Sequence, residues 1–170
     1  LNVIAGTDFL ARAGFNITKT NLANGLSKTV WPGRFERVPG LGPLTLYLDG
    51  AHNPDGVSAL AATWRELYPH QKADLLVGIL NDRPLLEMAA LLSPITRRVI
   101  VTEVPDPKTA SAAELGAVFK ELGVPTIIEP APEAALQLLL KTTNPFALVS
   151  GSLYLIGLLR PVLIKDQSNV

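Results

Sequence analysis

The densest cluster of side chains able to do chemistry is Asp49-Gly50-Ala51-His52-Asn53-Pro54. It stands where an apolar, strand-like run ends and a helical pattern begins. Asp49 can accept two hydroxyl hydrogen bonds, as a ribose requires, and Gly50 lets another surface approach closely. The first helical turn after Asn53 presents free backbone N–H groups to an anion. These features favour a ligand site.

The same residues also have a purely structural interpretation. Asn53 suits the N-cap of a helix, and Pro54 suits its first position. Trp31-Pro32-Gly33-Arg34 can likewise be a plain linker, in which Arg34 pairs with Glu36 or with solvent. Spacing alone leaves both interpretations open.

Several kinds of active site are excluded by what the chain lacks. None of the 13 glycines is followed by Lys, so the phosphate-binding loop G-x-x-x-x-G-K-[ST] does not occur. Ser150-Gly151-Ser152 lacks the upstream Gly of a G-x-S-x-G nucleophile elbow. Two widely separated histidines and no cysteine give no metal-ligand spacing.

Composition narrows the classes of partner. The 170 residues include 15 Lys and Arg and 15 Asp and Glu, so no basic field exists to hold nucleic acid. The absence of Cys fits a reducing compartment, and we expect a cytoplasmic protein. The longest apolar stretch, Leu153 to Ile164, contains Arg160 and Pro161 and is shorter than the roughly 20 residues of a spanning helix, so no membrane segment is expected.

The chain opens on Leu1 with a helical pattern already under way and not with a signal peptide, so we expect the sequence to begin inside a longer protein. Helices are expected over 1–13 and from Thr18, as N-cap, to about Lys28. Pro and Gly in Trp31-Pro32-Gly33-Arg34 then break the helix and mark a domain boundary.

After the boundary, two strands flank a Gly- and Pro-rich turn, and strands then alternate with helices. The helix over 55–68 should bury one face, and so should the helix over 111–122. The first face comprises Val57, Leu60, Ala61, Trp64, Leu67 and Tyr68, and the second Leu115, Val118, Phe119 and Leu122. Expected strands are 35–38, 44–48, 73–80, 98–102, 126–128 and 146–149; the other expected helices are 84–92, 132–141 and one from about Ser152.

This alternation predicts an α/β fold: a doubly wound, mostly parallel sheet flanked by helices. In such sheets ligands bind beyond the carboxyl ends of the strands. The loops of interest are therefore 49–55, 81–84, 103–109 and 150–152.

Three motifs carry a family resemblance: Trp31-Pro32-Gly33-Arg34-Phe35-Glu36, Asp49-Gly50-Ala51-His52-Asn53-Pro54, and Ser150-Gly151-Ser152-Leu153-Tyr154-Leu155. In this order and at these separations they resemble the C-terminal domain of folylpolyglutamate synthase and dihydrofolate synthase, in the Mur ligase superfamily. The resemblance implies a Rossmann-like C-terminal ligase domain over 31–170. Residues 1–30 would then be the helical end of the preceding central ATPase domain, with its linker.

The resemblance also implies roles for individual residues. Arg34 resembles the family arginine that reaches ATP, and Asp49 the aspartate that holds ATP from the other side of the cleft. His52 resembles the histidine near the reacting centre and is the expected catalytic residue. Asn2 resembles an asparagine of the central domain that contacts the nucleotide. The expected substrate-binding residues are Asn53, Ser150 and Ser152.

The implied reaction is an ATP-dependent ligation. ATP converts a substrate carboxylate into an acyl phosphate, and the amino group of glutamate attacks it to form an amide. The acceptor would be tetrahydrofolate, dihydropteroate or both. Magnesium and the phosphate loop would belong to the central ATPase domain, so these 170 residues alone are expected to be inactive as a ligase.

Two segments depart from the family pattern, so the identity of the acceptor substrate stays open. Asn81-Asp82-Arg83 stands where many relatives resemble Asp-Lys-Asp, and Asp106-Pro107-Lys108-Thr109 where they often resemble Asn-Pro-Arg-Ala. Lys cannot reproduce the planar fork of Arg toward a carboxylate. The alternatives are another Mur-type amino acid ligase and a non-catalytic nucleotide-binding or interaction domain.

Overall fold

The computed structural model describes residues 2–164, with side chains from residue 3 onward. The chain divides into two compact units, Leu1–Pro32 and Gly33–Val170.

The smaller unit consists of two helices, α1 (Asn2–Arg12) and α2 (Lys19–Lys28). Thr18 caps α2, as predicted: its hydroxyl oxygen accepts a hydrogen bond from the Asn21 backbone N–H at 3.0 Å, and the Asn21 side chain accepts one from the Thr18 N–H at 3.1 Å. This reciprocal pair satisfies two N–H groups at the start of the helix. Several apolar side chains of the unit are exposed: Val3, Ile4, Phe9, Leu10 and Phe15.

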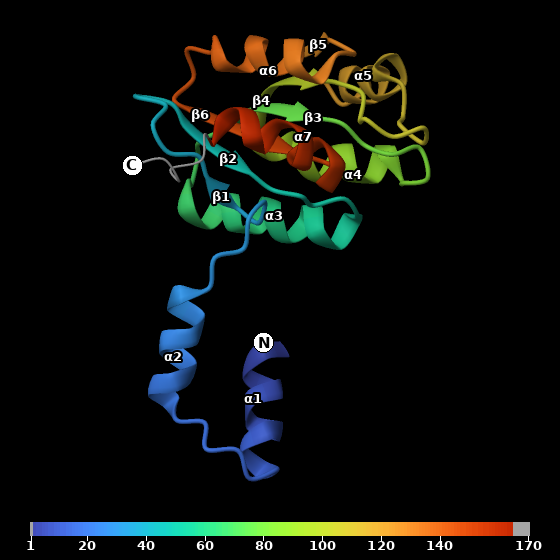
Figure 1. Cartoon of the computed structure of the whole chain (residues 1–170). Coiled ribbons are helices and arrows are strands. Elements are labelled where there is room, and N and C mark those ends of the chain that lie inside the picture. The colour runs from blue at the N-terminus through green and yellow to red at the C-terminus, as the bar shows by residue number, and fades with distance from the viewer. Residues whose placement is uncertain (1, 165–170) are drawn as a thin grey trace. The chain divides into compact units, whose positions relative to one another are not determined.

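The larger unit is built on a six-stranded sheet in the order β1-β2-β6-β3-β4-β5 (Figure 1). The first strand is antiparallel to its neighbour and every other pair is parallel, which confirms the predicted fold class. The strands are β1 (Glu36–Arg37), β2 (Thr45–Leu48), β3 (Ala73–Val77), β4 (Thr96–Val101), β5 (Thr126–Ile128) and β6 (Phe146–Ser150).

Helices cover both faces of this sheet. α3, α4 and α5 bury their apolar sides in one core cluster, and α6 and α7 bury theirs in a second cluster on the opposite face. The bounds are α3 (Pro54–Leu67), α4 (Leu85–Leu92), α5 (Ala112–Glu121), α6 (Pro132–Leu140) and α7 (Leu153–Leu163), with a 3₁₀ turn η1 (Ser93–Ile95).

The predicted helix faces are right except at their ends. Val57, Leu60, Ala61 and Trp64 are buried in the core. Leu67 is 55% exposed and Leu122 is 36% exposed, so assigning these two to the buried faces was wrong. Helical periodicity gives the direction of a buried face but not the point along the helix at which the covering surface stops.

The position of β6 decides where the loops meet. β6 lies between β2 and β3 and runs parallel to both, so the residues that follow these three strands gather at one edge of the sheet. Asp49 follows β2, Gly78 follows β3, and Ser150 ends β6. Segments about 100 residues apart in the sequence are thereby neighbours.

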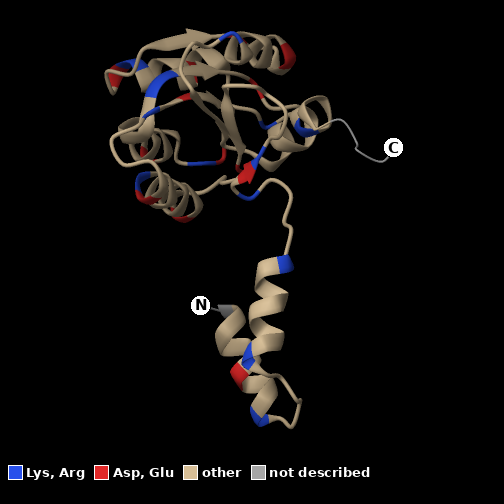
Figure 2. Cartoon of the chain, turned by 90° about the vertical axis from the view of Figure 1, so that its left-hand side faces the viewer, with Lys and Arg blue, Asp and Glu red and all other residues tan. Residues whose placement is uncertain are grey.

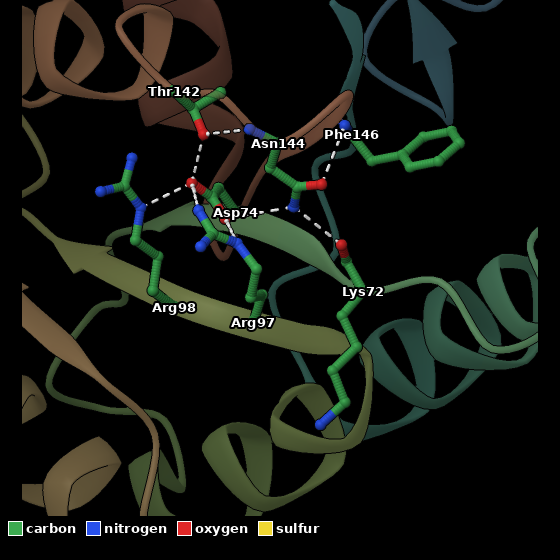
Figure 3. A network of polar contacts seen from close by, with 7 residues as sticks. All are labelled: Lys72, Asp74, Arg97, Arg98, Thr142, Asn144 and Phe146. Atoms are coloured by element: carbon green, nitrogen blue, oxygen red, sulfur yellow. Dashed lines mark hydrogen bonds and ion pairs between the residues drawn. The ribbon is translucent and has the colours of Figure 1, made fainter.

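A polar network ties the opposite edge of the sheet together (Figure 3). Asp74, near the start of β3, is fully buried and accepts hydrogen bonds from Arg97, Arg98, Thr142 and Asn144. Burial by itself raises the pKa of this carboxyl, but the donors, Arg97 first, hold the pKa below its usual range. The network joins β3, β4 and the loop before β6 through a single charge.

Charged residues of both signs are interspersed over the larger unit (Figure 2). This mixture agrees with the zero formal net charge. Within residues 2–164, no helix is both long and apolar enough to cross a membrane.

Candidate functional site

The candidate site lies where the connections leave the sheet in opposite directions. The chain after β2 enters α3 on one face, whereas the chain after β6 enters α7 on the other face. Such a switch in direction between neighbouring parallel strands opens a crevice beyond their carboxyl ends. The motifs that begin at Asp49 and at Ser150 border this crevice.

A cavity of about 350 Å³ occupies the β2 side of the crevice. This volume is within the range of small-molecule sites. Four residues predicted for the site line it, together with Phe35, Gly50 and residues of the first turns of α3: they are Arg34, Asp49, His52 and Asn53.

Asp49 is held in one orientation by backbone donors. It is 9% exposed, its Oδ1 accepts a hydrogen bond from the Ala51 N–H at 2.8 Å, and its Oδ2 accepts one from the Phe35 N–H at 2.8 Å. Burial raises the pKa of the Asp49 carboxyl, against the opposing effect of these two N–H groups and of Arg34. A carboxylate offers about four acceptor positions, so Asp49 keeps about two for a ligand in the cavity.

Gly50 is required for close packing, as its sequence position suggested. A Cβ at Gly50 would lie 2.3 Å from Leu153 Cδ2 and 2.5 Å from Arg34 Nη1. Any larger residue would have to move the guanidinium group or the end of the Leu153 side chain. The missing side chain therefore leaves room for Arg34 beside the cavity that it lines.

Phe35 has a strained backbone that the sequence did not reveal. Its φ of 44° is in the left-handed region, which a bulky residue rarely adopts. Its ring stacks on Tyr47 with centroids 4.3 Å apart, and the Tyr47 hydroxyl shares a hydrogen bond of 2.7 Å with the Tyr68 hydroxyl. Aromatic packing thus fixes a backbone turn that directs the Phe35 N–H at Asp49.

His52 faces two cavities at once. It lines the cavity described above and a second one of about 360 Å³ on the β6 side of the crevice. Its Nδ1 lies 2.9 Å from the carbonyl oxygen of Gly50. Because a carbonyl only accepts hydrogen bonds, Nδ1 carries the proton in this arrangement. The neutral ring then has its lone pair on Nε2.

Asn53 and Pro54 form the helix start that the structural interpretation predicted. Asn53 Oδ1 accepts a hydrogen bond from the Gly56 N–H at 2.8 Å, and Pro54 is the first residue of α3. The expectation that this turn presents free N–H groups to an anion is not met by Pro54, which has none, or by Gly56 and Val57, whose N–H groups are bonded to Asn53. Asn53 and Gly56 nevertheless line the cavity. Substrate binding by Asn53 stays a prediction.

The second cavity is lined by the start of α7 and by Arg83. Its remaining lining residues include His52, Gly151, Ser152 and Tyr154. Gly151 has a φ of 100°, and a Cβ there would lie 2.6 Å from the Gly78 carbonyl oxygen. Only glycine fits this turn, which brings the β6 loop onto the end of β3.

The two serines of the β6 loop differ in their local surroundings. Ser152 caps α7 by accepting a hydrogen bond from the Tyr154 N–H at 3.1 Å. Ser150 Oγ is buried, and no hydrogen-bond partner for it is found among the described residues. Ser152 thus has a structural task, and Ser150 has an unused polar group at the end of β6.

We expect Ser152→Ala to destabilise the larger unit by about 1 kcal/mol through the loss of a helix cap. Ser150→Ala removes only an unpartnered hydroxyl, so its free energy of unfolding should stay within about 0.5 kcal/mol of the parent or rise. Urea unfolding followed by circular dichroism measures both. If Ser150→Ala lowers the free energy of unfolding as much as Ser152→Ala does, the Ser150 hydroxyl is not an unpartnered group.

Two further loops meet at the same edge. The Asn81 N–H donates a hydrogen bond of 2.7 Å to the Lys108 carbonyl, and Leu80 and Thr109 form an isolated bridge. The loops 81–84 and 103–109, predicted as ligand loops, are therefore in contact. Of the two cations in these loops, Arg83 and Lys108, Arg83 lines the second cavity.

The site geometry does not test the predicted role of Asn2 or the predicted use of magnesium. Asn2 is the first residue of α1, and its side chain is outside the part that the structure describes. From residue 3 to residue 164, no cluster of three or more His, Asp or Glu side chains could hold a metal ion.

Comparison with known proteins gives a consistent picture. Residues 33–153 match the family model described as Mur ligase, glutamate ligase domain. The chain is 31% identical over 147 residues to the dihydrofolate synthase/folylpolyglutamate synthase of Bacillus subtilis, covering 85% of this chain and 33% of that protein. It thus spans about a third of the length of this relative and of the folylpolyglutamate synthase of Lacticaseibacillus casei.

Solved structures agree on the fold. A folylpolyglutamate synthase from Thermotoga maritima superimposes with a TM-score of 0.76 and 28% identity, covering 96% of this chain and 38% of that one. A Mycobacterium tuberculosis folylpolyglutamate synthase complexed with ADP gives a TM-score of 0.77 at 24% identity, covering 92% and 37%.

Proposed function

The chain belongs to the family of glutamate ligase domains of Mur ligases, and on this premise we propose that it is the C-terminal domain of an ATP-dependent folate ligase. The complete enzyme would add L-glutamate to tetrahydrofolate, to dihydropteroate or to both. The observation that carries this proposal is the convergence of Arg34, Asp49 and His52 on one cavity at the switch point of the sheet.

Asp49 would hold the nucleotide by its ribose. Its two free acceptor positions suit a pair of neighbouring hydroxyl groups, and its backbone hydrogen bonds prevent rotation of the carboxylate. Arg34 would face the phosphates, because a guanidinium group stabilises negative charge and matches the geometry of phosphate oxygens. Asp49 thereby positions the nucleotide without reacting itself.

His52 would act at the amine. The incoming glutamate reaches the site as an ammonium ion, and it must lose a proton before its nitrogen attacks the activated carboxylate. The hydrogen bond from Nδ1 to Gly50 leaves Nε2 of neutral His52 free to accept that proton. The same residue lines both cavities, which suits a group placed between the nucleotide and the amino acid.

The overall chemistry forms an acyl phosphate and ADP from ATP and the acceptor carboxylate; attack by the amine then gives the amide and releases phosphate. Positive groups directed at the phosphoryl oxygens supply much of the acceleration in such reactions. The phosphate loop and the magnesium ligands would come from a central ATPase domain, to whose end we assign α1 and α2. The exposed apolar side chains of these helices suit packing within such a domain.

The test is ATP-dependent incorporation of radiolabelled glutamate by this chain extended by its natural upstream coding sequence. Dihydropteroate and tetrahydrofolate are offered separately, and the 170-residue chain alone serves as a control that should give no product. Incorporation into either acceptor supports the proposal and identifies the substrate. A fully folded, ATP-hydrolysing enzyme that labels neither acceptor would instead indicate a different Mur-type acceptor.

A further inference from the structure

Three hydrogen bonds hold the backbone of the segment that carries Arg34, two at Gly33 and one at Phe35. The Gly33 N–H donates a hydrogen bond of 2.7 Å to Glu36 Oε2, and the Gly33 carbonyl accepts one of 2.8 Å from the Gly50 N–H. The Phe35 N–H is bonded to Asp49. Arg34, which lines the cavity, thus stands between two residues whose backbone is fixed.

Glu36 is in turn held from the far end of α7. Arg160 donates from Nε to Glu36 Oε2 at 2.9 Å and from Nη2 to Oε1 at 2.8 Å, which is a two-point contact across 124 positions of sequence. The Glu36 side chain is 16% exposed and that of Arg160 is 34% exposed. Hydrogen bonds from Arg160 lower the pKa of the Glu36 carboxyl. Paired, partly buried groups of this kind define geometry better than surface ion pairs do.

The backbone of this segment needs such support. Gly33 has a φ of 69°, and a Cβ there would lie 2.9 Å from Ile156 Cγ2, so the segment lies directly against α7. Phe35 has the strained φ of 44°. Strained residues keep their conformation only when surrounding contacts hold them. The Glu36–Arg160 pair is a hydrogen-bonded contact that joins this segment to α7.

We propose that Arg160 is a positioning residue for the nucleotide site: it holds Glu36, Glu36 holds the Gly33 backbone, and this orders Arg34 toward the cavity. The role of Arg34 toward the nucleotide rests on the function proposed above. Arg160 itself lines neither of the two cavities at the crevice. Its effect would therefore reach the nucleotide only through Arg34, and we expect it in the affinity for ATP.

The first experiment is residue-level amide hydrogen exchange by NMR on the 170-residue chain carrying Arg160→Gln. The amides of Gly33, Phe35 and Gly50 should exchange about ten-fold faster or more, while Leu75 and Val149 in the sheet keep their protection. Arg65→Gln, on the exposed side of α3, is the matched control and should change none of them. Arg160→Lys keeps the positive charge but not the two-point geometry of the guanidinium group. Its exchange rates should therefore lie between those of the parent and those of Arg160→Gln.

The second experiment measures ATP dependence in the chain extended by its upstream coding sequence. Arg160→Gln should raise the KM for ATP about five- to ten-fold with little change in kcat. The double variant Glu36→Gln/Arg160→Gln should raise this KM no more than either single variant does. Unchanged exchange at Gly33, Phe35 and Gly50, or acceleration spread evenly over the sheet, would overturn the proposal.

Failure of the positioning role and failure of the proposed function would give different results. Faster local exchange with an unchanged KM in Arg160→Gln, while Asp49→Ala still raises the KM, would overturn the positioning role and leave the proposed function intact. If neither variant changes the KM for ATP, the nucleotide assignment of this cavity fails, and the positioning role fails with it.

Discussion

Asp49→Ala in the upstream-extended ligase should raise the KM for ATP by at least about ten-fold. The substitution removes a carboxylate that two backbone N–H groups hold in one orientation, and with it the acceptor positions that face the cavity. It also leaves the N–H groups of Phe35 and Ala51 without their partner. Initial rates at varied ATP, with glutamate and acceptor saturating, measure the effect.

Controls separate loss of binding from loss of structure. Asp49→Asn keeps one acceptor oxygen and should be milder than Asp49→Ala, whereas Glu66→Gln, an equal loss of charge at an exposed position of α3, should leave the KM unchanged. Arg34→Ala should also raise the KM for ATP. Circular dichroism of each variant should match the parent. A folded Asp49→Ala enzyme with unchanged ATP kinetics would rule out Asp49 as a nucleotide ligand.

The largest loss of stability is expected from Asp74→Ala, at about 3 to 5 kcal/mol. Asp74 is fully buried, and its removal leaves Arg97, Arg98 and Thr142 without their common acceptor. Because the Arg97 side chain is 48% exposed and that of Arg98 is 29% exposed, water replaces part of the lost contact, which favours the lower end of this range. Urea unfolding of the 170-residue chain measures the change.

Asp82→Ala is the matched control, because it breaks an Asp–Arg pair at the surface, where the Asp82 side chain is 46% exposed. It should cost less than about 1 kcal/mol. Equal losses in the two variants would contradict the structural role of Asp74.

The same carboxylate should make stability depend on pH in the acid range. The folded-state pKa of Asp74 is lowered, so its contribution is fully present above the pKa of the unfolded chain, about 4, and is lost as pH falls through the folded-state pKa. The parent chain should therefore lose stability more steeply below about pH 4 than Asp74→Ala does. Parallel slopes for the two proteins would contradict the lowered pKa.

Much of the fold was predictable because its signals are local. Alternating apolar runs and amphipathic helices gave the α/β class, and the caps at Thr18 and Asn53 follow from hydrogen bonds that span only three residues. The exposure of Leu67 and Leu122 was missed because a repeat of 3.6 residues carries no information about where the covering surface ends.

The site was predictable in its parts but not in its assembly. Residue types and spacing pointed to Asp49 and His52, and the family resemblance assigned them and Arg34 their roles. Nothing in the sequence indicated that Phe35 would adopt a strained backbone to hold Asp49, or that Arg160 would reach Glu36. These contacts join residues 14 and 124 positions apart, and no periodic pattern encodes them.

The sequence by itself determined the elements, the segments that carry chemistry and the family, because each depends on neighbouring residues or on motifs read in order. Only the tertiary structure decided that β6 enters between β2 and β3. That placement brings Ser150-Gly151-Ser152 beside Asp49-Gly50-Ala51-His52 and makes His52 face two cavities. The physical reason is that strand order is fixed by packing of both sheet faces at once, α3 to α5 on one and α6 with α7 on the other.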